Sequence, residues 1–110
     1  KETKDLINYS TLIKMKKNSI IVNTARGGII NELDLEKALN ENVIFGAALD
    51  VFSKEPIEKN NPLLKNKKVI LSPHSATFTD ECTSRMGIET TKNIIEFFEN
   101  KLDKSKTIKL

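Results

Sequence analysis

A short apolar segment, residues 19–22, is followed by the run Asn-Thr-Ala-Arg-Gly-Gly at residues 23–28. Three of its four residues are β-branched, so the segment predicts a strand, and the continuity of apolar character predicts burial on both faces. The two glycines let the chain turn tightly or let another group approach the backbone. Because open parallel sheets bind ligands beyond the carboxyl ends of their strands, we expect Arg26 to hold an anion there.

Three helices are expected around this strand. Each has at its start a side chain that can accept hydrogen bonds from the free amide groups of the first turn. The expected helices are residues 11–17, capped by Ser10, a second from Asn31 to residues 40–42, capped by Asn31, and residues 79–100, capped by Thr79. In the second helix, Leu35, Ala38 and Leu39 recur at helical spacing and predict one buried face. In the last helix Gly87 weakens the pattern, and the charged tail 101–110 is expected to be loose or extended.

Two further apolar runs, residues 43–49 and 69–71, predict additional strands. Pro73 closes the latter because proline cannot continue the ladder of a sheet. Residues 51–68, which are rich in Asn and contain two prolines, predict a loop with one helical turn beginning at Asn61. A helix between two strands gives a parallel, right-handed unit, so we expect an α/β domain with a short parallel sheet.

Charge and cysteine content narrow the partners of this small domain. The net charge of +3 comes from 18 basic residues interleaved with 15 acidic ones, which favours a solvated surface over a nucleic-acid interface. The one cysteine, Cys82, lies among apolar neighbours in the last helix and predicts a buried thiol in a reducing, cytoplasmic setting. No apolar run is long enough to span a bilayer, and no metal site is expected.

Polar side chains follow each of the three expected strands: Arg26, Asp50 and His74. Parallel neighbouring strands would bring these groups, together with Glu55, to one edge of the sheet. A glutamate beside an imidazole favours the protonated ring, which can donate a proton to a ketone oxygen. An arginine can bind a carboxylate through two parallel hydrogen bonds. The combination predicts reduction of a 2-keto acid.

Each of these residues also has a structural interpretation, which stays open at this point. Arg26 could pair with Glu32, Asp50 could cap a short turn, and Glu55 could be a solvated loop residue. His74 is the single histidine of the chain, and one histidine by itself is weak evidence for catalysis.

Four motifs resemble, in order and spacing, those of the D-isomer-specific 2-hydroxyacid dehydrogenases. They are Asn-Thr-Ala-Arg-Gly-Gly at residues 23–28, Gly-Ala-Ala-Leu-Asp-Val-Phe-x-x-Glu-Pro at 46–56, Asn-Pro-Leu at 61–63, and Ser-Pro-His at 72–74. The resemblance covers nearly the whole chain. It implies an oxidoreductase that moves a hydride between NAD(H) and a D-2-hydroxy or 2-keto acid.

The resemblance also implies roles for individual residues. Arg26 would bind the carboxylate and carbonyl of the substrate, His74 would be the general acid and base, and Glu55 would be its partner. The cofactor contacts would come from Thr3, Thr24, Ala25, Arg26, Asp50, His74, Ser75 and Ala76. Asp50 would lie near the nicotinamide carboxamide, and Ala76 departs mildly from the glycine of many members. Glu55 favours the hydroxyacid branch over the related formate dehydrogenases, which are expected to carry Gln there.

The fold implied is a partial Rossmann-type, three-layer α/β/α arrangement, namely the second half of an NAD-binding domain. The chain holds no Gly-x-Gly-x-x-Gly turn after a strand and no acidic residue about twenty positions beyond one, which the family carries upstream. Residues 1–100 would form this half, with helix 79–100 leading back toward a missing substrate domain and residues 101–110 as a tail. We expect the isolated chain to be inactive, and the full-length protein to be a homodimer.

Two other interpretations are weighed against the enzyme. The first is an NAD-sensing, corepressor-like binding protein of the same family without metabolic turnover, for which the charge pattern offers no partner motif. The second is a purely structural α/β module. Phe78, four residues after His74, would give the enzyme an apolar wall near its substrate.

Overall fold

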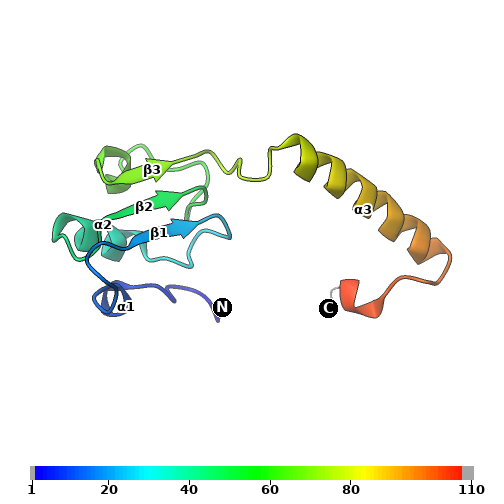
Figure 1. Ribbon diagram of the computed structural model, residues 1–110, viewed down its shortest axis with the longest axis horizontal. Coiled ribbons are helices and arrows are strands. Elements are labelled where there is room, and N and C mark those ends of the chain that lie inside the picture. Colours follow the sequence, from blue (N-terminus) through cyan, green and yellow to red (C-terminus); the bar gives the residue numbers. More distant parts are fainter. Residues whose placement is uncertain (1, 108–110) are drawn as a thin grey trace. The chain divides into compact units, whose positions relative to one another are not determined.

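The computed structural model describes residues 2–107, which gather into two compact units that divide between Ala76 and Thr77. The first unit contains one parallel sheet of three strands in the order β1-β2-β3 (Figure 1). The strands are β1 (Ile20–Asn23), β2 (Gly46–Leu49) and β3 (Val69–Leu71). Their last residues are register partners, Asn23 with Leu49 and Leu49 with Leu71. The predicted α/β fold with a short parallel sheet is confirmed.

The helix between the first two strands, α2 (Glu32–Asn40), forms as its sequence predicts. The side chain of Asn31 accepts a hydrogen bond from the amide of Asp34 at 3.1 Å, which satisfies one free donor of the first turn. The buried residues of this helix are the three that its periodicity indicated, Leu35, Ala38 and Leu39. They join one hydrophobic core with Ala47 and Leu49 of β2. A 3-10 turn at Pro62–Lys65, capped by Asn61, adds Leu63 to that core.

The first helix lies earlier than predicted. α1 spans Tyr9–Leu12 and begins after Asn8, so the expected helix over residues 11–17 with an N-cap at Ser10 is wrong. The Asn8 side chain accepts from the amide of Thr11, while the Thr11 hydroxyl accepts from the amide of Asn8 at 2.9 Å. This reciprocal pair satisfies two free donors at once, whereas a helix capped by Ser10 would have Ile13 at the third position, which offers no acceptor.

The second strand is shorter than its apolar run. Residues 43–45 precede β2 instead of belonging to it, because the amide of Val43 donates to Ala38 O at 2.9 Å and extends the end of α2. Asn42 has a left-handed φ of 57°, which is typical of the residue that closes a helix. Ile44 is buried, and Phe45 is exposed.

The prediction that β1 is buried on both faces is wrong for this unit. Ile20, Val22 and Ile70 are 59%, 64% and 74% exposed. Their sequence neighbours on the other face, such as Ile21 and Val69, pack against the core. The reason is that the core residues of α1, α2 and the 3-10 turn pack against the face that carries Ile21 and Val69. Within Lys1–Ala76 the opposite face of the sheet is therefore uncovered.

The second unit is the helix α3 (Asp80–Phe98) followed by a 3-10 turn at Lys104–Lys106. Thr79 caps α3 as predicted, accepting from the amide of Cys82 at 3.1 Å, and the helix runs unbroken through Gly87. Cys82 is half-buried, so the prediction of a buried thiol is wrong; α3 has no buried residue. In the tail expected to be loose or extended, Lys104–Lys106 form a 3-10 turn capped by Asp103, while residues 101–103 have no regular structure; residues 108–110 lie outside the described part. Among the described helices, none has both the length and the apolar character needed to cross a membrane.

Candidate active site

The three strands end at one edge of the sheet, and the predicted site residues lie in the loops that follow. Arg26 follows β1, Asp50 and Glu55 follow β2, and His74 follows β3. The amide of Asp50 donates to Asn23 O at 3.0 Å, which continues the pairing of the strands beyond their last residues. The sheet therefore brings these loops together, as the sequence predicted.

Glu55 and His74 form a hydrogen-bonded pair. Nδ1 of His74 lies 2.8 Å from Oε2 of Glu55, and the amide of Phe52 donates to Oε1 of the same carboxylate at 2.9 Å. The hydrogen bond with His74, followed by that from Phe52, lowers the pKa of Glu55 below its ordinary value. An ionised carboxylate accepts the Nδ1 proton, so Nε2 is the ring nitrogen that can exchange a proton with another molecule. Both side chains are accessible, at 47% for His74 and 38% for Glu55.

Asp50 is buried and is bonded to the loop that carries His74. Its Oδ1 accepts from the Ser72 hydroxyl at 2.5 Å and from the Ser75 amide at 2.8 Å, and its Oδ2 accepts from the Ala76 amide at 2.9 Å. The Ser72 hydroxyl, then the Ser75 amide, lower the pKa of Asp50. Asp50 therefore organises the residues on both sides of His74, rather than capping a turn of its own.

Arg26 sits in a turn that a buried side chain holds in place. Oδ1 of Asn23 accepts from the Ala25 amide at 3.1 Å, and Nδ2 of Asn23 donates to Arg26 O at 3.0 Å. The Arg26 side chain is exposed, and its Nη1 donates to Ala25 O at 2.6 Å. It does not pair with Glu32, whose carboxylate accepts instead from the Ser53 amide at 2.6 Å and from Asn61. The guanidinium is therefore available to an anion.

Gly27 brings the first two loops into contact. A Cβ atom at this position would lie 1.8 Å from the carbonyl oxygen of Phe52, so only glycine allows this approach. Gly28 adopts a φ of 77°, in the region that glycine enters without strain. The loop that holds Arg26 is thus fitted against the loop that holds Glu55.

The remaining predicted cofactor residues are small and accessible. Thr3, Thr24, Ala25 and Ala76 are exposed and Ser75 is half-buried. The turn at Thr3 lies beside the first loop, because the amide of Asp5 donates to Gly28 O at 2.8 Å. Short side chains on neighbouring loops leave the backbone open to a flat ring, so the residues present fit the nicotinamide half of a dinucleotide.

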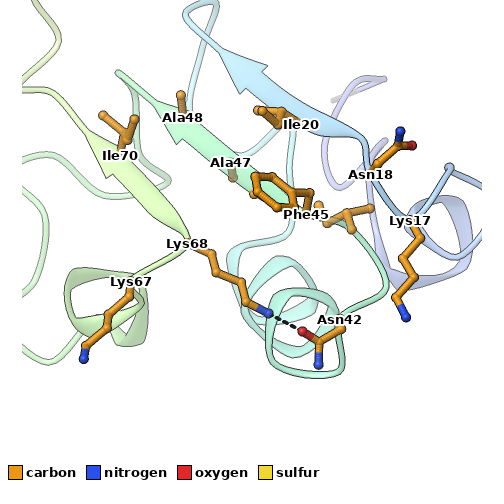
Figure 2. A pocket seen from close by; sticks show the side chains of 12 residues that line it. Lys17, Asn18, Ile20, Asn42, Phe45, Ala47, Ala48, Lys67, Lys68 and Ile70 are labelled. Atoms are coloured by element: carbon orange, nitrogen blue, oxygen red, sulfur yellow. Dashed lines mark hydrogen bonds between the residues drawn. The ribbon is translucent and has the colours of Figure 1, made fainter.

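Two cavities lie on the first unit. The smaller, of about 470 Å³, is lined by Glu55 and His74 and by the apolar side chains of Phe52, Pro56, Ile57 and Pro73. The larger, of about 670 Å³, lies on the uncovered face toward the amino ends of the strands, where Figure 2 shows Ile20, Phe45 and Ile70. Of these two cavities, the smaller has Glu55 and His74 in its wall, so it is the candidate site. Within residues 2–107 no group of three or more His, Cys, Asp or Glu side chains could hold a metal ion.

Sequence reasoning missed the side chains that support the site, namely Asn23, Ser72 and the anchoring role of Glu32. A polar residue directly after an apolar strand is a usable signal for Asn23. Ser72 also follows an apolar strand, but that signal does not identify its partner Asp50, which is 22 positions away. Glu32 was considered only as a partner for Arg26, and its bond to Ser53 spans 21 positions.

The chain matches one family model and is similar to several proteins named as reductases or dehydrogenases. The family model described as D-isomer specific 2-hydroxyacid dehydrogenase, NAD binding domain, matches residues 1–76. A glyoxylate reductase of Aeropyrum pernix is 46% identical over 92% of this chain and 30% of its own length. A D-3-phosphoglycerate dehydrogenase of Archaeoglobus fulgidus is 42% identical over 86% of this chain and 18% of its own length. The chain thus spans about a third or less of the relatives that it matches.

Solved structures agree with these matches. An acyclic imino acid reductase in complex with NADPH and D-Arg superposes with a TM-score of 0.83 and 31% identity, covering 92% of this chain and 32% of that one. The glyoxylate reductase of Paecilomyes thermophila gives a TM-score of 0.77 at 36% identity, covering 86% of this chain and 29% of that one. Both similarities extend over most of the present chain.

Proposed function

The chain belongs to the D-isomer-specific 2-hydroxyacid dehydrogenase family, through its NAD-binding domain, and on that premise we propose that it supplies the acid–base half of an oxidoreductase site. The reaction would interconvert a 2-keto acid and a D-2-hydroxy acid. The single observation that carries this proposal is the pair formed by Glu55 and Nδ1 of His74, 2.8 Å apart at the carboxyl edge of the sheet. A hydride reaching a carbonyl carbon requires a proton at the oxygen, and this pair is suited to provide it.

Three side chains would share the work on the substrate. His74 donates its Nε2 proton to the carbonyl oxygen during reduction and takes it back during oxidation. Glu55 stabilises the positive ring through Nδ1 and fixes its orientation. Arg26, exposed in the neighbouring loop, binds the carboxylate of the substrate and polarises its carbonyl. A bound nicotinamide cofactor would supply or accept the hydride.

The cofactor would lie across the loops at the strand ends. We assign its nicotinamide half to the residues Thr24, Ala25, Ser75 and Ala76 together with Asp50, and its phosphate and ribose side to Thr3. The support is their position at the carboxyl ends of parallel strands, where such folds bind dinucleotides. Neighbouring structures were solved with NADPH or NADP, which supports a nicotinamide cofactor at this fold.

Glyoxylate is the substrate with which we would begin, since several relatives are named glyoxylate reductase. It is the smallest 2-keto acid and needs only the carboxylate and carbonyl contacts that Arg26 and His74 offer. The named relatives are reductases and dehydrogenases, which gives no support to a corepressor-like binding protein.

The rest of the proposal concerns the whole protein. We propose that α3 leads toward a substrate domain, and that the protein is a homodimer working in the cytoplasm. The sheet supports a covering element, because β1 is an edge strand and edge strands are normally covered, here by the rest of the domain or by a partner. The 110 residues contain no glycine-rich turn for a pyrophosphate, so we expect no turnover from them alone.

The proposal is tested by assaying the full-length protein that contains these residues. Purified protein is mixed with NADH or NADPH and with glyoxylate, hydroxypyruvate or pyruvate, and cofactor oxidation is followed by absorbance. We expect oxidation with at least one of these acids. Tight cofactor binding without reduction of any of these 2-keto acids would contradict the proposal and favour a binding protein.

A further inference from the structure

His74 has a backbone conformation that its own side chain does not favour. Its φ is 54°, in the left-handed region, where residues other than glycine are uncommon because of their Cβ atom. Such a conformation persists when the surrounding structure fixes it. Interactions of the residues before and after His74 must therefore fix the conformation of this loop.

The buried carboxylate of Asp50 is the group that does so. Its three hydrogen bonds reach Ser72, two residues before His74, and the amides of Ser75 and Ala76 directly after it. Asp50 is 3% exposed, and with Asn23 it is one of the polar residues that the fold buries among residues 2–107. An ionised group with so little access to water is stabilised only by such bonds.

The loop is anchored by charge-assisted bonds on both sides of the histidine. Because Ser72 and Ser75 bond to the same oxygen of Asp50, the chain between them is drawn into a tight bend. That bend points the imidazole toward Glu55, whose own oxygen Oε1 is fixed by the Phe52 amide. Both partners of the acid–base pair are therefore held by the residues that follow β2.

We propose that Ser72 and Asp50 form a positioning clamp, which holds His74 in its left-handed conformation and so aligns Nδ1 with Glu55. The expected effect of the clamp on kcat rests on the proposed function. The expected effect on the position of His74 does not. In this clamp Ser72 is a positioning residue, and Asp50 positions His74 in addition to any contact that it makes with a cofactor.

Two substitutions separate the clamp from a cofactor contact. Ser72→Ala removes the hydroxyl and leaves the carboxylate in place, whereas Ser72→Thr keeps a hydroxyl that can donate to Asp50. Asp50→Asn keeps the shape of the side chain but sets an NH₂ group or a weaker oxygen against the amides of Ser75 and Ala76. Ser53→Ala is the matched control, because that exposed serine uses only its backbone amide, toward Glu32.

The direct readout is the proton NMR signal of Nδ1–H of His74 in the full-length protein, identified by its loss in His74→Gln. We expect a slowly exchanging, hydrogen-bonded signal in the wild type, in Ser72→Thr and in Ser53→Ala. We expect it to be broadened or lost in Ser72→Ala and Asp50→Asn. In parallel, kcat should fall about tenfold or more in these two variants, because small misplacements of a catalytic group are costly.

The outcomes distinguish this clamp from the proposed function. A sharp Nδ1–H signal and unchanged kcat in Ser72→Ala would overturn the clamp. So would an Asp50→Asn variant that keeps the signal and only weakens cofactor binding. If the wild type reduces no 2-keto acid, the proposed function fails, while the NMR signal still decides whether the clamp holds His74.

Discussion

Nδ1 of His74 lies 2.8 Å from the carboxylate of Glu55, although the two residues are 19 positions apart and follow different strands. The pair exists because β2 and β3 are parallel neighbours that end in register. The second oxygen of Glu55 is bound to the Phe52 amide at 2.9 Å, so the carboxylate cannot rotate freely away from the ring.

Replacing Glu55 with Gln should preserve this loop and weaken catalysis. Glutamine can still accept from Phe52, but it cannot stabilise a charged imidazole. We expect kcat for 2-keto acid reduction to fall by about 10- to 100-fold. The measurement is kcat of the full-length protein at saturating cofactor and keto acid. Glu58→Gln, at an exposed glutamate that pairs with Lys54, is the control; equal kcat values for both variants would contradict the assignment.

Arg26→Lys should raise KM for the keto acid far more than it lowers cofactor affinity. Lysine keeps the charge but loses the two parallel hydrogen bonds that a guanidinium makes to a carboxylate. We expect an increase in KM of about tenfold or more, since hydrogen bonds to charged groups contribute about 1.5–3 kcal/mol. Arg85→Lys on α3 provides the matched control. An unchanged KM for Arg26→Lys would remove this residue from the substrate site.

Gly27→Ala should force the first two loops apart. The added Cβ would lie 1.8 Å from Phe52 O, a contact that the backbone must move to relieve. We expect the free energy of unfolding of the first unit to fall by about 1–3 kcal/mol, as in other overpacked sites. Gly87→Ala has open space and lies inside a helix, so it should be neutral or stabilising by about 0.5–1 kcal/mol. Urea unfolding compares the two; similar effects would contradict the contact.

The amides of Ser75 and Ala76 should become unprotected in acid. Folding lowers the pKa of Asp50 below its ordinary value of 3.8, first through the Ser72 hydroxyl and then through the Ser75 amide. A lowered pKa means that this stabilisation is complete above the ordinary value and is lost as the pH falls through the lowered one. Hydrogen exchange at a series of pH values should show this loss in the wild type. Asp50→Asn should lack such a pH-dependent step, and a protection profile at these two amides that is the same in Asp50→Asn as in the wild type would refute the coupling.

Leu39→Ala should destabilise the first unit much more than Leu33→Ala on the same helix. Leu39 is fully buried, whereas Leu33 is 70% exposed. A buried Leu-to-Ala change costs about 2–5 kcal/mol, and a surface change is usually within about 0.5 kcal/mol. Denaturant unfolding measures both. Equal losses would mean that the core does not lie on this face of α2.

Local sequence signals predicted the features that depend on neighbouring residues. The buried face of α2 follows from the spacing of Leu35, Ala38 and Leu39 and from the cap at Asn31. The start of α1 was misplaced because Asn8 and Ser10 are both good caps, and the reciprocal bond with Thr11 decides between them. The exposed face of β1 could not be read from its apolar residues, because alternation of burial depends on which helices cover the sheet.

The site divides in the same way. Arg26, Glu55 and His74 were predicted to lie at one edge because polar residues follow apolar strands in a fixed order, and parallel pairing brings the loops that carry them to that edge. The contact between Gly27 and Phe52 and the bonds from Asp50 to Ser72, Ser75 and Ala76 join residues more than twenty positions apart. Such pairings depend on loop conformation, which no local pattern specifies.

The central claim is that His74 transfers the proton during 2-keto acid reduction. The most direct test compares the full-length wild type with His74→Gln for glyoxylate reduction at saturating NADH, with cofactor affinity measured by NADH fluorescence. We predict a fall in kcat of about 10²- to 10⁴-fold, with a much smaller change in cofactor affinity. A His74→Gln variant that reduces glyoxylate at the wild-type rate would contradict the claim.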